Sequence, residues 1–247
     1  MIGKNDITDF YFIRHGPSVK KAGHLPPHDA PLVEQEFSLD ALVKTLPHHA
    51  DWHISPLRRA QQTTTLLTGH LAPASMTTEP ALGEQHFGDW HDQPVATIWQ
   101  QVATLPKHNW SFITHDFCPP HGESFDQQVL RVASWCDLQE RKRFTTAQII
   151  VAHIGTIRAV LAHIFALPAD VAQAIEIPYF GGLHASLMAK DHASQNQGGA
   201  WQIHSWAQSR RPPPEGYSVI FQRRYVGFVK CRAPRGSIQP IDPSSRR

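Results

Sequence analysis

Cysteine is scarce in this chain of 247 residues, which contains only Cys118, Cys136 and Cys231. The three cysteines are odd in number, lie far apart and form no C-x-x-C pair. The sequence therefore shows neither a disulfide framework nor the usual ligand spacing of a structural zinc site. Such sparse cysteine is typical of a reducing compartment, and we expect a cytoplasmic protein.

Long hydrophobic runs are also missing. The most apolar stretch, residues 149–167, is interrupted by His153, Arg158 and His163 and is too polar to span a membrane. The first twelve residues lack the basic and then apolar order of a signal peptide. We therefore expect no membrane partner.

The net charge is small, at +2, and unevenly distributed. Residues 210–247 carry nine Lys/Arg and two Asp/Glu, whereas residues 1–209 carry a net charge of −5. We expect a folded domain over residues 1–209 and a basic extension over 210–247, rich in Pro and Ser and poorly ordered. Because the positive surplus belongs to the extension, we expect no nucleic-acid partner.

Hydrophobic periodicity alternates between strand and helix patterns along the domain. Short apolar or aromatic runs predict strands at residues 8–13, 51–55, 148–152, 183–189 and 200–206. Helical spacing predicts helices at residues 37–46, 56–67, 93–105, 124–144 and 155–165. The apolar face expected for helix 124–144 comprises Phe125, Val129, Val132, Trp135, Cys136 and Leu138. This alternation predicts a three-layer α/β/α fold with a mostly parallel central sheet.

Basic and imidazole side chains follow two of the predicted strands directly. Arg14 and His15 come after the first strand, and His153 comes after strand 148–152. In open α/β sheets the carboxyl ends of the strands border the ligand crevice. Backbone N–H groups of the helix that begins near Gly155 would add to the attraction for an anion. The sequence therefore predicts an anion-binding pocket at this edge.

Five segments resemble, in the same order, the motifs of the histidine phosphatase superfamily, which includes the cofactor-dependent phosphoglycerate mutases. They are Phe12-Ile-Arg-His-Gly16, Ser55-Pro-Leu-Arg-Arg-Ala-Gln-Gln-Thr63, Leu82-Gly-Glu-Gln-His-Phe-Gly-Asp-Trp90, Pro120-His-Gly-Glu-Ser124 and Val151-Ala-His-Ile-Gly-Thr-Ile-Arg158. An R-H-G triplet alone is weak evidence, whereas five motifs in order, over residues 9–206, are strong evidence. The resemblance implies a phosphoglycerate mutase-like fold.

The resemblance implies catalytic roles for His15, Glu84 and His153, and phosphate-binding roles for Arg14, Arg59 and Ser18. A neutral His15 would attack the phosphorus in line and become a phosphohistidine. Glu84 would protonate the leaving group and then activate the attacking water. Arginine suits the phosphate because its planar fork forms paired, charge-assisted hydrogen bonds. This mechanism implies no metal and no cofactor.

Less specific interpretations apply to several of these positions. Gln85 and His86 are also candidate proton donors beside Glu84. Ser124 and Gln127 have the spacing of a capping box, so Ser124 is first explained as a helix N-cap. A histidine such as His153 is, taken alone, more often a core residue than a catalytic one.

Other basic residues and histidines fit the family pattern less well. Lys21 stands where the family usually has asparagine, and Lys20 or Lys21 could contact the substrate. Arg58 is expected to be a solvated charge, since Arg59 is the residue that precedes the alanine of the motif. The seventeen histidines include no H-E-x-x-H or comparable pattern, so we expect no metal site.

Hydrolysis of a small phosphorylated metabolite is the function we expect first. The short Trp-containing segment before Pro-x-Gly-Glu-Ser-Phe125 looks most like α-ribazole phosphatases, which suggests α-ribazole 5′-phosphate as a substrate. A cofactor-dependent phosphoglycerate mutase is the alternative, but the segment after Phe87 has no Lys or Arg until Lys107 to hold a substrate carboxylate. A catalytically idle binding protein is the second alternative. The chain could also form a homodimer.

Overall fold

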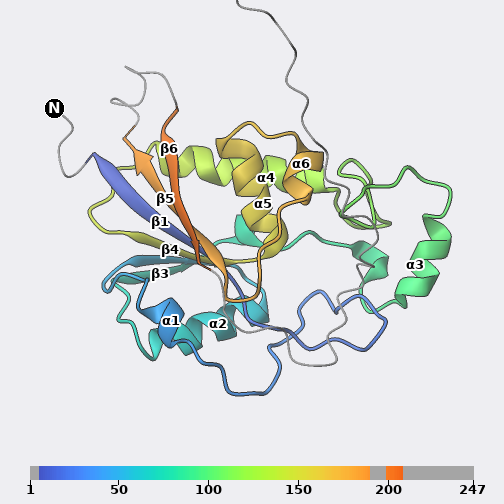
Figure 1. The fold of residues 1–247 in the computed structure, drawn as a ribbon, viewed down its shortest axis with the longest axis horizontal. Coiled ribbons are helices and arrows are strands. Elements are labelled where there is room, and N and C mark those ends of the chain that lie inside the picture. The colour runs from blue at the N-terminus through green and yellow to red at the C-terminus, as the bar shows by residue number, and fades with distance from the viewer. Residues whose placement is uncertain (1–5, 190–198, 208–247) are drawn as a thin grey trace, which may run out of the picture. The chain divides into compact units, whose positions relative to one another are not determined.

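A six-stranded sheet organises the residues that the computed structural model describes, 6–189 and 199–207 (Figure 1). The strand order is β3-β2-β4-β1-β5-β6. The strands are β1 (Ile7–Arg14), β2 (Asp51–Ile54), β3 (Ser75–Thr78), β4 (Gln148–Ala152), β5 (Gly182–Met188) and β6 (Trp201–Ala207).

Strands β1 to β4 run parallel, while β5 is antiparallel to both β1 and β6. The carboxyl ends of β1, β2 and β4 consequently lie at one edge of the sheet. Because β5 is reversed, it begins at this same edge, where Gly182 pairs with Ile13. The expected mostly parallel sheet is thus confirmed, with a reversed strand near one side.

Helices cover both faces of the sheet (Figure 1). On one face lie α1 (Asp40–Val43) and α2 (Arg58–Thr68), and on the other lie α4 (Phe125–Glu140) and α5 (Ile154–Ile164). Side chains alternate along β1, so Phe12 packs in one apolar cluster with Ile157, whereas Ile13 packs in the other with Leu67. The expected three-layer α/β/α architecture is confirmed.

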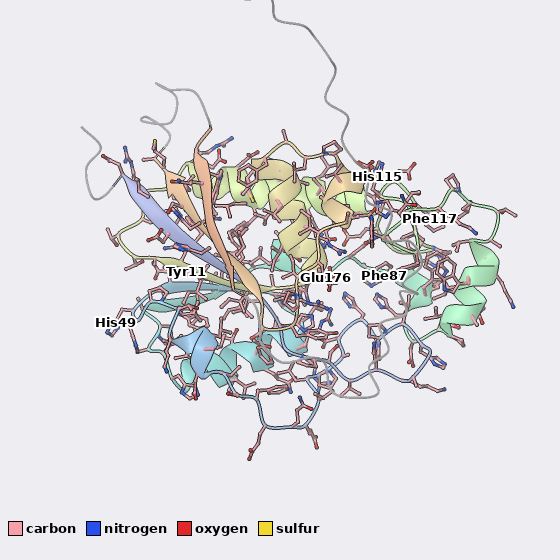
Figure 2. The ribbon with its side chains drawn as sticks, in the orientation of Figure 1. Tyr11, His49, Phe87, His115, Phe117 and Glu176 are labelled. Atoms are coloured by element: carbon pink, nitrogen blue, oxygen red, sulfur yellow. The ribbon has the colours of Figure 1, made fainter. Side chains whose placement is uncertain are left out.

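A third, smaller apolar cluster joins the segments around α3 (Val95–Gln101). Its buried members include Trp90 and Ile98, and Phe87 and Phe117 pack against them on the α3 side of the molecule (Figure 2). The short 3-10 helix η2 (Gly88–Trp90) contributes Trp90 to this cluster, whereas η1 (Pro80–Leu82) places Leu82 in the cluster that contains α4 residues. Gly88 has a φ of 54°, and a Cβ there would lie 1.9 Å from the Pro120 carbonyl oxygen. Only glycine fits this turn.

Several predicted elements differ in length from those observed. The helix expected over 37–46 is only the four-residue α1, because no side chain caps its start and Pro47 follows soon after. The helices α3 and α4 are also shorter than expected, and Leu138 on α4 is 55% exposed, so its place on the apolar face was wrong. The sequence interpretation missed β3, all of whose residues are exposed, and the five-residue α6 (Ala169–Gln173).

The expected extension over residues 210–247 falls outside the described residues. Within the described ranges, every helix is too short or too polar to cross a lipid bilayer.

Candidate active site

His15 follows the last residue of β1 and is buried at the carboxyl edge of the sheet. Its backbone N–H donates to the Ala152 carbonyl at the end of β4. The ring Nδ1 lies 2.6 Å from the Gly16 carbonyl oxygen, and Arg59 Nε donates to the ring Nε2 over 3.1 Å. Since a carbonyl can only accept, the hydrogen is assigned to Nδ1, which leaves the lone pair on Nε2.

The surroundings of His15 favour its neutral form. Burial, followed by the positive charges of Arg59 and Arg14, holds the pKa of His15 well below the usual value for histidine. An imidazole with such a pKa is unprotonated at neutral pH. His15 therefore presents a nitrogen lone pair beside a guanidinium, which is the arrangement that attack on a phosphorus atom requires.

His153 stands between β4 and α5 and is fully buried. Its ring centroid lies 4.9 Å from that of His15. The Nε2 atom is 2.6 Å from Ser55 Oγ, which also accepts from the Leu57 N–H. Ser55 has one hydrogen to give, and donation to Nε2 places the His153 hydrogen on Nδ1. Within the described residues Nδ1 has no hydrogen-bond partner, although it is buried.

Two arginines border the histidine pair. Arg59, in the first turn of α2, is buried and donates to the carbonyl of His28 over 2.7 Å, whereas Arg58 is exposed as expected. Arg14 lies with its guanidinium carbon 3.9 Å from the ring centroid of Tyr179. In the described part of the chain, neither Arg14 nor Arg59 forms a salt bridge within 4 Å. The pocket consequently has a surplus of positive charge.

Glu84 reaches the same region from the loop after η1. Its carboxylate accepts from the backbone N–H of Gln85 at 3.0 Å, from Gln128 Nε2 at 3.3 Å and, weakly, from the N–H of Gly155 at 3.4 Å. A Cβ at position 155 would lie 2.2 Å from Glu84 Oε1. Glycine at 155 therefore lets the carboxylate approach the first turn of α5, two residues from His153. Burial lowers the pKa of Arg59, and the negative charge of Glu84 partly offsets this effect by raising it.

The Glu84 loop is held by α4. Arg131 donates to the carbonyls of Ala81, Gly83 and Glu84, and it forms a salt bridge of 2.6 Å with Glu123. Together, these hydrogen bonds hold the backbone of the loop against α4. Glu123 thus has a structural role as the partner of Arg131, which the sequence interpretation did not single out.

The N-terminus of α4 confirms one further expectation. The Gln127 N–H donates to Ser124 Oγ, and the Ser124 N–H donates to Gln127 Oε1, so both halves of the capping box are present. The first-choice interpretation of Ser124 as an N-cap was therefore right.

The structure brings Arg14, His15, Arg59, Glu84 and His153 to one edge of the sheet, as the sequence predicted, while their catalytic roles stay predictions. Ser18 is buried in the loop after His15, but its hydroxyl makes no hydrogen bond to the other predicted site residues within the described part. Lys20 and Lys21 are exposed. Sequence reasoning missed Ser55, Gln128 and Tyr179, which contact the site residues.

A second group of histidines lies next to this pocket. His28, His86 and His91 each offer one ring nitrogen to a set whose members all lie within 4.8 Å of one another. His28 comes from one loop and His86 and His91 from another, with 57 residues between His28 and His86, so no short sequence pattern could reveal the cluster. They are the described residues near the pocket that could hold a metal ion.

Comparison with known proteins gives a consistent result. A family model described as histidine phosphatase superfamily (branch 1) matches residues 10–220. The structure of a mycobacterial glucosyl-3-phosphoglycerate phosphatase is similar with a TM-score of 0.61 and 20% identity, over 82% of this chain and 100% of that one. A candidate α-ribazole-5′-phosphate phosphatase of Escherichia coli has a TM-score of 0.58 and 21% identity, over 80% and 94% of the two chains.

YhfR of Bacillus stearothermophilus is also similar, with a TM-score of 0.61 and 21% identity over 79% of this chain and 95% of its own. Identities this low show a shared fold. No curated protein matches the sequence.

Proposed function

Since this chain belongs to the histidine phosphatase superfamily, we propose that it is a phosphomonoesterase that acts through a phosphohistidine at His15. One observation carries the proposal. The Gly16 carbonyl holds His15 Nδ1, so the lone pair on Nε2 faces Arg59 in a buried pocket with a surplus of positive charge. A buried cationic pocket around a neutral imidazole suits a phosphate ester as the substrate.

In the first step, the lone pair of His15 Nε2 forms a bond to phosphorus while the bond to the ester oxygen breaks. Glu84, in its protonated form, gives its hydrogen to the departing oxygen. Arg59 exchanges its contact with His15 Nε2 for a phosphoryl oxygen. The unpartnered Nδ1–H of His153 is a second donor of the right kind for such an oxygen.

In the second step, water attacks the phosphorus of the phosphohistidine. The Glu84 carboxylate takes a proton from that water as the nitrogen–phosphorus bond breaks, and His15 regains its lone pair. Inorganic phosphate leaves, and Glu84 is protonated again. Positioning and charge stabilisation supply most of the catalysis in phosphoryl transfer, which matches a pocket built from fixed donors.

The test is trapping of the covalent intermediate. Full-length protein is mixed with a radiolabelled phosphomonoester, quenched in alkali and examined for protein-bound label, because phosphohistidine survives alkali and is lost in acid. We expect label in the wild type and none in His15→Ala, together with a loss of p-nitrophenyl phosphate hydrolysis. His70→Ala, a change at an exposed histidine after α2, is the matched control. Unchanged hydrolysis in His15→Ala would disprove the proposal.

The substrate is proposed more narrowly as a small phosphorylated metabolite, with α-ribazole 5′-phosphate as the first candidate. The sequence pattern around residues 87–125 supports it, and one of the similar structures is named for that substrate. Glucosyl-3-phosphoglycerate is a second compound for the panel, because another similar structure is named for it. Comparing kcat/KM across such a panel identifies the preferred substrate. Efficient conversion of 3-phosphoglycerate to 2-phosphoglycerate would instead favour the mutase.

A further inference from the structure

The histidine cluster next to the phosphate pocket is compact. The ring centroids of His28 and His86 lie 4.4 Å apart, and each lies 5.0 Å from that of His91. All three side chains are partly buried, and a set of their ring nitrogens lies within 4.8 Å. The proposed hydrolysis uses none of these side chains, so their convergence needs its own explanation.

We propose that His28, His86 and His91 bind a divalent transition-metal ion of the Zn²⁺ type. Three imidazoles with one remaining coordination position are an established ligand set for zinc, and imidazole also suits Co²⁺, Ni²⁺ and Cu²⁺. The proposal goes beyond the phosphatase activity and does not depend on it. A small inward movement of the rings brings the three nitrogens to the separation of tetrahedral ligands, which are about 3.4 Å apart at zinc–nitrogen distances.

The cluster is also held in place by its loops. The His91 Nδ1 lies 3.2 Å from the Pro26 carbonyl oxygen, a contact that orients the ring as an outer-shell partner does in metal sites. The backbone of His86 is tied to Glu123 by two hydrogen bonds, of 3.0 and 2.8 Å. Loop 23–28 is linked to the His91 segment through the Leu25 N–H, which donates to the Gln93 carbonyl over 3.0 Å.

Metal binding requires two exchanges of contacts. The His91 Nε2 now accepts from the Phe87 N–H, and the His86 Nδ1 accepts from the Gly88 N–H, both at 3.0 Å. Each nitrogen has a single lone pair, so coordination through it replaces the contact. By contrast, the His28 ring makes no hydrogen bond within the described part of the chain, so it is free to rotate toward an ion.

The cluster lies beside the catalytic residues. The carbonyl of His28 accepts from Arg59 Nη1, and His86 follows Glu84 by two positions. A bound ion would add positive charge near the arginine that contacts His15. The site is thus placed where an ion can influence the anion pocket without occupying it.

The experiment measures metal binding directly. Metal-free full-length protein is titrated with Co²⁺, whose visible absorption reports the ligand geometry, and Zn²⁺ is then added in competition. Because His28 has no hydrogen bond to lose, His28→Ala and His28→Gln are the variants of choice, and their folding is verified by circular dichroism without metal. We expect one equivalent of Co²⁺ in the wild type and a loss of affinity of about tenfold or more in either variant.

Two matched controls assign the ion to this cluster. His15→Asn removes the other adjacent histidine pair, and His184→Ala removes the Asp9, His184 and His204 group, which is also spaced to hold a metal. Both controls should bind as the wild type does. The proposal is overturned if the wild type binds no Co²⁺ or Zn²⁺, if folded His28 variants bind with wild-type affinity, or if binding disappears in either control.

Discussion

Ser55 determines which nitrogen of His153 carries the hydrogen. Because its hydroxyl lies 2.6 Å from Nε2, the hydrogen of the imidazole is directed to Nδ1, the buried atom without a partner among the described residues. Removing the hydroxyl lets the other tautomer form, and that tautomer offers a lone pair to the phosphate in place of a donor. In the proposed mechanism, Ser55 is therefore a positioning residue that acts through His153.

We predict that Ser55→Ala lowers kcat for p-nitrophenyl phosphate by about 10- to 100-fold, the usual effect of losing an orienting partner of a functional histidine. Ser134→Ala is the control, since Ser134 bonds its hydroxyl to a carbonyl on an exposed part of α4. The comparison uses steady-state kinetics, with thermal unfolding to verify the fold. A wild-type kcat in Ser55→Ala would rule out the positioning role.

Residue types and strand order were enough to predict that Arg14, His15 and His153 converge, whereas Arg59 and Glu84 were assigned through the family resemblance. Arg14, His15 and His153 follow strands whose carboxyl ends share an edge, so their proximity follows from topology. The contacts of Ser55 could not be predicted, because they depend on side-chain directions across β2 and β4. The His28 cluster was missed for a related reason, since two separate loops form it and loop conformation is not encoded in a periodic pattern.

At the scale of elements, the approach of the Glu84 loop to α5 depends on Gly155. A Cβ there would lie 2.2 Å from Glu84 Oε1 and 2.8 Å from Gln128 Oε1. A methyl group would push the carboxylate away from the pocket, although the helix itself would tolerate alanine.

We predict that Gly155→Ala lowers kcat by about tenfold or more, within the range that general acid–base catalysis supplies. The loss should be greater for an alkyl phosphate than for p-nitrophenyl phosphate, whose leaving group needs less help from an acid. Gly69→Ala, at a helical φ of −62° and with its nearest atom 3.4 Å away, is the matched control and should leave both rates unchanged. Equal losses on the two substrates would argue against displacement of Glu84.

Elements with a long or fully buried apolar pattern were predictable, and short ones were not. β4 is buried at every position, and its boundaries matched the prediction. β3 consists of four exposed residues, Ser75 to Thr78, and is defined by its backbone pairing with β2. α1 shows the opposite failure: Leu39, Leu42 and Leu46 are buried as helical spacing predicts, but only one turn of helix forms.

For the molecule as a whole, buried neutral histidines connect stability to pH. The pKa values of His15 and His153 in the folded protein lie well below 6.5, the ordinary value that applies when the chain is unfolded. Below pH 6.5 these histidines therefore bind protons in the unfolded chain but stay unprotonated in the folded chain. The contribution of these two neutral histidines to the free energy of unfolding is complete above pH 6.5 and falls as the pH drops below that value.

Each such histidine contributes a slope of about 1.4 kcal/mol per pH unit in that window. We predict that the free energy of unfolding, measured with urea at pH 7.5 and 5.5, falls less steeply in His153→Asn than in the wild type. Asparagine cannot take up a proton, so one group no longer contributes to the difference in bound protons between the unfolded and folded states. An identical pH dependence in both proteins would contradict the buried, neutral state of His153.

The described unit holds the proposed catalytic residues, all within residues 14–153. We predict that removing residues 212–247 leaves kcat/KM and the thermal midpoint unchanged within error, as measured on purified truncated and full-length protein. This outcome would support the expectation that residues 210–247 form an extension outside the folded domain. A drop in kcat/KM with an unchanged midpoint would instead give the extension a part in substrate binding.

The reversed direction of β5 has a practical consequence. Since β5 begins beside the end of β1, where His15 follows, it ends at the opposite edge of the sheet, where Met188 lies. β1 also starts at that edge, with Ile7 opposite Met188. A tether or fluorescent label attached at Ile7, whose side chain is 45% exposed, would thus hold the protein by the edge opposite the predicted site residues. Immobilised in that orientation, the protein would keep its phosphate pocket open to the solution.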